Sequence, residues 1–115
     1  MKDWTQIQER YMHDELSVRL GGLAANLSRI KSFSMNEAGK DAVESLIDES
    51  KMFIEWTAAQ AEINTAEKLV EVQVQLALWQ LQWGTIWSDV SKRKQVAEQS
   101  NLWSKQVLEM SGLLK

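Results

Sequence analysis

Helix-breaking residues are so sparse in this chain that they constrain its fold more than any other feature. The 115 residues include no Pro and five Gly, and the forty-four residues of 40–83 contain neither. This run is rich in Ala, Leu, Glu, Gln and Lys, whose side chains lose little rotamer freedom in a helix. A strand protein needs turn residues about every ten positions, and they are missing. The sequence therefore predicts an all-α fold.

Length and composition bound the class of protein. We expect one domain over residues 1–115, because a chain of this size buries roughly two-thirds of its unfolded surface. No Cys is present, which excludes disulfides, thiolate metal sites and a Cys nucleophile. The apolar run 76–79 is far shorter than the ~20 residues of a membrane span, and residues 1–5 lack a secretory signal's apolar stretch. We therefore expect a cytoplasmic protein with no membrane contact.

The apolar periodicity predicts four helices, over about residues 3–32, 35–63, 66–90 and 92–111. Gly21-Gly22 lies inside the first, and we interpret the pair as a close approach of another backbone, with a helix break as the alternative. Ser34 and Glu37 fit a capping box that starts the second helix. Gly112 fits the C-cap of the last. Such lengths favour an antiparallel four-helix bundle with short loops.

The second and third helices keep nearly the same helical phase, which leaves one alternative open. A single helix over 35–90, in an intertwined dimer, would also have this phase. It would be ~84 Å long at 1.5 Å per residue, well beyond the common range. Asn64-Thr65, followed by Glu67, can end one helix and cap the next. We therefore expect a hairpin near residues 63–65.

Charge is distributed unevenly over these segments. Residues 34–64 have a net charge of −5 and residues 91–115 of +3, whereas residues 65–90 hold only four charged side chains. The acidic group Asp41, Glu44 and Asp48 shares one side of its helix. The basic stretch 92–94 is the internal partner that we expect for it, as surface pairing that sets register more than stability.

The weakly charged segment 66–90 has two apolar faces. One comprises Leu69, Val72, Leu76, Trp79, Trp83, Ile86 and Val90, and the opposite one comprises Val70, Val74, Leu78 and Leu81. A helix with two apolar faces needs partners on both sides. Uncharged Gln side chains border the second face, which favours a self-association surface. We predict a homo-oligomer, most simply an antiparallel two-fold dimer; the alternative is a wide core stripe within one chain.

Six Trp residues are far more than average composition supplies. We interpret Trp79, Trp83, Trp87, Trp56 and Trp103 as core or interface aromatics, because indole combines a large apolar area with one N–H donor. The alternative is that they wall a pocket for a flat or apolar ligand.

Signals for catalysis or cofactors are missing. The one histidine, His13, pairs with Glu9 one turn away, whereas a bundle di-metal site needs two Glu-x-x-His motifs. No nucleophile motif or phosphate-binding glycine loop is present, and a net charge of −3 opposes nucleic-acid binding. We expect a non-enzymatic interaction or assembly protein without cofactor or metal. Its expected partners are a second copy, as a homodimer, and an unidentified protein. The alternative function is a small-ligand-binding bundle with a Trp-lined pocket.

Overall fold

The computed structural model describes residues 2–114, and this part of the chain is helical with no strand. The prediction of an all-α protein is confirmed. The elements are α1 (Trp4–His13), α2 (Leu16–Ser34), a 3-10 turn η1 (Glu37–Gly39), α3 (Lys40–Thr57), a 3-10 turn η2 (Ala58–Gln60), α4 (Ile63–Leu81), α5 (Trp83–Trp87) and α6 (Val90–Ser111).

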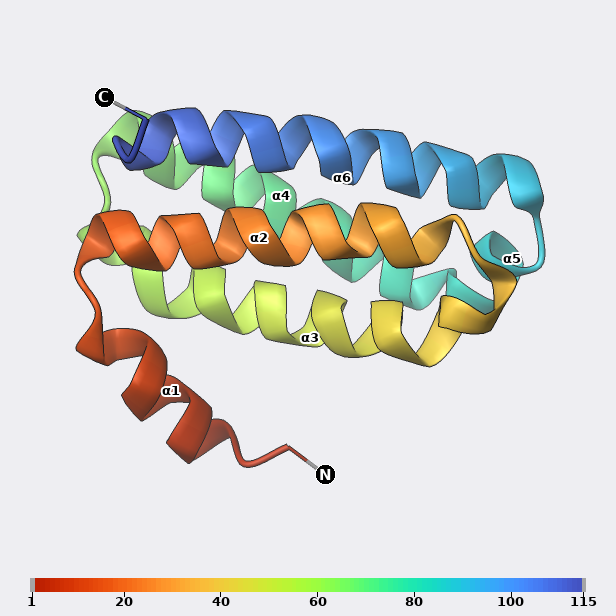
Figure 1. Cartoon of the computed structure of the whole chain (residues 1–115), viewed down its shortest axis with the longest axis horizontal. Coiled ribbons are helices and arrows are strands. Elements are labelled where there is room, and N and C mark those ends of the chain that lie inside the picture. The colour runs from red at the N-terminus through yellow and green to blue at the C-terminus, as the bar shows by residue number, and fades with distance from the viewer. Residues whose placement is uncertain (1, 115) are drawn as a thin grey trace.

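The four longest helices run side by side along the long axis of the molecule, and consecutive ones alternate in direction (Figure 1). α2 packs against both α3 and α6, and α3 packs against α4. The short α5 turns the chain at one end, and α1 diverges from the other helices at the opposite end. The fully buried side chains come from all four long helices and follow the predicted periodicity; they include Leu23, Leu27, Ile30, Val43, Ile47, Ile54, Leu69, Val72, Leu76 and Val107.

The predicted first helix, 3–32, is wrong in its continuity, because the backbone is extended at Asp14 and Glu15. The break lets α1 dock on α3, where Tyr11 stacks on Phe53 with ring centroids 3.9 Å apart. Gly21 and Gly22 lie within α2 and leave it intact. A Cβ on Gly21 would lie 2.6 Å from Cδ1 of Leu113, so the close neighbour is a side chain near the C-terminus rather than a backbone.

The alternative of one helix over 35–90 is wrong, because the chain leaves the helical conformation at Ala61 and Glu62 between α3 and α4. A hairpin forms as expected, although its turn comes just before residues 63–65. Tertiary contacts hold the turn there. Thr57 donates a hydrogen bond to the Tyr11 hydroxyl at 3.3 Å, and Nη2 of Arg19 donates to Oε1 of Gln60 at 2.5 Å.

The other predicted boundaries shift as well. α3 begins at Lys40 rather than 35, with Gly39 as its N-cap and no capping side chain. The capping side chain in this segment is Asn36 rather than Ser34, and it starts η1 by accepting from the amide of Ala38 at 2.9 Å. The predicted helix 66–90 is two helices, since α4 ends at Leu81 and α5 follows it. The last helix spans 90–111, and Gly112 ends it with a left-handed φ of 83°, as predicted.

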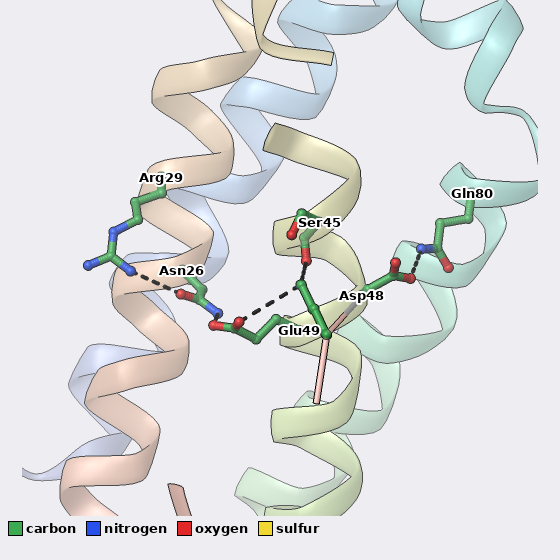
Figure 2. A network of polar contacts seen from close by, with 7 residues as sticks. Asn26, Arg29, Ser45, Asp48, Glu49 and Gln80 are labelled. Carbon is green, nitrogen blue, oxygen red and sulfur yellow. Dashed lines mark hydrogen bonds and ion pairs between the residues drawn. The ribbon is translucent and has the colours of Figure 1, made fainter. Parts of the chain in front are cut away.

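A polar network sets the register of α2, α3 and α4 (Figure 2). Arg29 donates to Oδ1 of the buried Asn26, and Nδ2 of Asn26 donates to Oε1 of Glu49 at 3.1 Å. On the next helix pair, Nε2 of Gln80 donates to Oδ1 of Asp48 at 2.6 Å. The Gln80–Asp48 hydrogen bond joins α4 to α3, and Leu69, Val72 and Leu76 turn one side of α4 towards the core.

Candidate interaction surface

The outward side of α4 is an apolar strip on the surface. Val70, Val74, Leu78 and Leu81 are 46%, 54%, 46% and 83% exposed, whereas Leu69, Val72 and Leu76 on the opposite side are fully buried. At about 100° per residue the two sets lie on opposite sides of the helix. We call the four exposed side chains the outer face of α4. Within residues 2–114 the chain leaves these side chains largely uncovered.

The glutamines that border the outer face make contacts within the molecule. Gln73 donates to the Lys51 carbonyl at 3.1 Å and to Oε2 of Glu55 at 3.0 Å, and Gln80 bonds Asp48 and Lys51. Both therefore join α4 to α3. The uncharged border thus has a role in the fold of one chain, so the apolar side chains remain the feature that predicts self-association.

Sequence reasoning missed one member of this surface. Ile63 is the first residue of α4 and is 73% exposed. Because the predicted helix began at residue 66, Ile63 fell in the expected turn. Its spacing of seven residues from Val70, about two helical turns, is the signal that would have included it.

The structure divides the predicted aromatic set into three groups. Trp79 of α4 contacts Trp103 of α6, with ring centroids 5.2 Å apart. Trp83 and Trp87 contact each other on α5 at 5.3 Å, and Nε1 of Trp87 donates to the Glu37 carbonyl.

Trp56 forms the third group, at the α1–α3 contact. It meets the edge of Trp4 at a centroid distance of 6.3 Å and lies near Tyr11 and Phe53. The five predicted tryptophans therefore do not share one internal pocket.

A surface groove of about 630 Å³ runs between α4 and α6, with Trp79 and Trp103 among the side chains that line it. Both indoles are at least nine-tenths buried, so they contribute edges of apolar surface rather than open rings. The remaining lining is mostly polar and comprises Lys68, Glu71, Gln75, Gln95, Glu98, Gln99 and Leu102.

A second cavity, of about 540 Å³, includes Tyr11 and Arg19 in its lining. The Tyr11 hydroxyl donates to the Arg19 carbonyl at 2.8 Å. Burial raises the pKa of Tyr11 to about 12, against smaller lowering effects of the Thr57 hydrogen bond and the Arg19 charge. A phenol with so high a pKa stays protonated at neutral pH and acts as a hydrogen-bond donor here.

The expected pairing of the acidic group on α3 with residues 92–94 does not form. Within residues 2–114, the ion pairs at 4.0 Å or less are Lys2–Glu49 and Lys68–Glu71. α3 packs against α2 and α4, whereas α6 packs mainly against α2. Arg93 instead lies over the ring of Trp87 at 5.3 Å.

In residues 2–114 no three His, Cys, Asp or Glu side chains come together in a way that could hold a metal ion. His13 is an exposed residue at the end of α1. Every helix in that range is too short or too polar to cross a bilayer.

Comparison of the chain with protein-family models, with curated proteins and with solved structures found no match.

Proposed function

We propose that this chain is a non-enzymatic interaction protein, a four-helix scaffold of α2, α3, α4 and α6 that self-associates through the outer face of α4. The single observation that carries the proposal is the row Val70, Val74, Leu78 and Leu81, exposed on one side of a helix whose other side is buried. Covering a half-exposed Val or Leu side chain contributes roughly 1 kcal/mol. The free energy of a helix with such a row falls when a second apolar surface covers the row.

The first test is the mass of the protein in solution. One chain has a mass of 13.2 kDa, and light scattering at tens of micromolar should give twice that value. The double variant Val70→Lys/Leu78→Lys should return the monomer mass, because two desolvated ammonium groups oppose the contact.

Val18→Lys is the matched control. Val18 lies on α2 and is 45% exposed, nearly the same as Val70, so it tests a lysine at equal exposure away from α4. It should leave the dimer intact. A wild-type monomer at these concentrations would contradict the proposal. So would a Val18→Lys control that loses the dimer as fully as the double variant does.

A second function is favoured by the groove between α4 and α6, which we propose as a site for an elongated, partly apolar ligand. Trp79 and Trp103 beside exposed Leu102 support it. Naphthalene derivatives that carry an amide should change the Trp emission on titration. Leu102→Glu should weaken that response, and Leu114→Glu, outside the groove, should not. A response that Leu102→Glu leaves unchanged would count against the groove.

A further inference from the structure

Four exposed apolar side chains of α4, Ile63, Val70, Val74 and Leu81, form a row that is symmetric along the helix, and exposed Leu78 lies beside this row. Ile63 and Leu81 are eighteen residues apart, about five turns, so they lie on one line at opposite ends of α4. Val70 is seven residues from Ile63, and Val74 is seven residues from Leu81. At about 100° per residue both valines are within ~20° of that line. The order of the four side chains is thus nearly the same from either end of the helix.

From this symmetry we propose that a second copy of the chain covers the outer face of α4 in antiparallel register, with the two-fold axis crossing the outer face at the height of Val72 along the helix. The inference rests on the self-association proposed above and adds which residues meet. In this register Ile63 faces Leu81 of the second copy, and Val70 faces its Val74. A two-fold contact must be self-complementary, and this row meets that requirement without another partner.

The residues beside the row also match in this register. Ala66 and Ala77 lie on the same flank of the row, near opposite ends, and Ala66 comes to face Ala77 of the second copy. Two alanines across a helix pair allow the axes to approach at the short end of the usual 8–10 Å. On the other flank, Glu67 faces Leu78 of the second copy, so its methylene groups cover the leucine while its carboxylate stays in water.

Charge favours the antiparallel over the parallel arrangement. Glu67 is the charged residue of α4 nearest the row, about 40° from its line at 100° per residue. Glu71 and Lys68 are about 80° and 140° from that line and line the α4–α6 groove. In a parallel pair the two Glu67 carboxylates would lie at the same height, on opposite sides of the contact. In the antiparallel register they are ten residues apart along the axis, about 15 Å at 1.5 Å per residue. At that distance physiological salt largely screens their repulsion.

Disulfide cross-linking tests the register, since the natural chain has no Cys. Ile63→Cys and Leu81→Cys are made as separate full-length variants, mixed, and oxidised mildly. The mixture should form the heterodimeric disulfide roughly tenfold faster than either variant alone, because only the mixed pair comes within the ~7 Å that a disulfide allows. Two copies of Leu81 would be about 27 Å apart at 1.5 Å per residue. The control mixture is Val18→Cys with Leu114→Cys, two exposed positions outside α4.

The outcomes separate the register from the association itself. If the wild type is a dimer by mass but each single variant cross-links to itself, the pairing is parallel and the inferred register is wrong. If the dimer forms and no α4 pair cross-links above the control, another surface or another register is used, which also overturns the inference. If the wild type is a monomer, the proposed self-association fails first. Preferential cross-linking of the mixed pair supports the inference.

Discussion

Gly39 and Gly84 show how differently the surroundings of a single residue can restrict a helical turn. A Cβ on Gly39 would overlap the backbone carbonyl oxygen of Phe33, whereas a Cβ on Gly84 would have nothing within 4 Å. The first glycine allows α2 and η1 to approach closely. The second, Gly84 on α5, has open space where a Cβ would lie. This difference between the two glycines is not visible in the sequence, because both have helix-forming residues around them.

These surroundings predict opposite effects of alanine at the two positions. Gly39→Ala should lower the free energy of unfolding by about 1–3 kcal/mol, the usual cost of overpacking, because a backbone carbonyl cannot move aside as a side chain can. Gly84→Ala should be neutral or stabilise by up to ~1 kcal/mol through helix propensity. Urea denaturation measures both values. Equal effects would show that the contact with Phe33 does not restrict the turn.

Tyr11 is the only tyrosine in the chain, so its ionisation can be followed alone by absorbance near 295 nm. Burial raises its pKa to about 12, and the titration midpoint should lie well above the ordinary value near 10. In the unfolded chain the phenol loses its proton near pH 10 while the folded protein keeps it. Its contribution to stability is therefore complete below pH 10 and is lost as the pH rises towards 12.

The same shift predicts the pH dependence of folding. At about 1.4 kcal/mol per pH unit, the loss between pH 10 and 12 approaches roughly 3 kcal/mol. Tyr11→Phe should cost about 1 kcal/mol at neutral pH, since the hydrogen bond to Arg19 is lost, and should remove this part of the alkaline slope. Urea midpoints across the range measure it. A midpoint near pH 10, or an unchanged slope in Tyr11→Phe, would contradict the buried environment of the phenol.

At the scale of the element, Asp89 defines the start of α6. Its carboxylate accepts from the amides of Ser91 and Lys92 at 2.9 and 3.3 Å, two donors that the helix leaves unpaired. Asp89→Ala should lower stability by about 1 kcal/mol, whereas Asp89→Asn, which keeps the acceptor, should change it little. Thermal unfolding followed by circular dichroism measures both. If the two variants lose equal stability, the effect comes from charge and not from capping.

Helix identity was more predictable than helix boundaries. The core periodicity of residues 20–30 and 69–79 appears in the sequence, and the structure buries its apolar positions, Leu20, Leu23, Leu27, Ile30, Leu69, Val72, Leu76 and Trp79. The break after His13 had a weak signal, since Tyr11 and Leu16 are five residues apart where the neighbouring apolar steps are three or four. The turn at 58–62 had an even weaker sequence signal, because Ala, Gln and Glu all favour helix. Its place depends on Thr57 and Gln60 bonding to side chains of α1 and α2.

Of the candidate site, the outer face could be predicted and the aromatic grouping could not. Periodicity within one helix puts Val70, Val74, Leu78 and Leu81 together whatever the rest of the chain does. Grouping Trp79 with Trp103 depends on which faces of α4 and α6 meet. The end of α4 at Leu81 separates Trp83 and Trp87 from it.

For the whole molecule, self-association predicts that thermal stability depends on concentration. A ligand that binds only the folded state stabilises it by mass action, and here that ligand is a second chain. Above the dissociation constant, a tenfold rise in concentration adds about 1.4 kcal/mol, which should raise Tm by roughly 3–6 °C for a dimer of this size.

The control for this prediction is Val70→Lys/Leu78→Lys, whose Tm should not change with concentration. Its substitutions lie on the surface, so the monomer should still fold. A Tm of the wild type that stays constant over the same range would contradict the self-association.

The scarcity of helix breakers and the spacing of apolar residues were sufficient to define an all-α chain and the two faces of α4, because both follow from backbone geometry within a few turns. Tertiary contacts determined where the helices end, which tryptophans meet and which glutamines bond to α3. Each of these depends on side chains far apart in sequence, and local propensity does not distinguish a helix that continues from one that folds back. The same sparse glycines that allow long helices therefore leave the positions of the turns to packing.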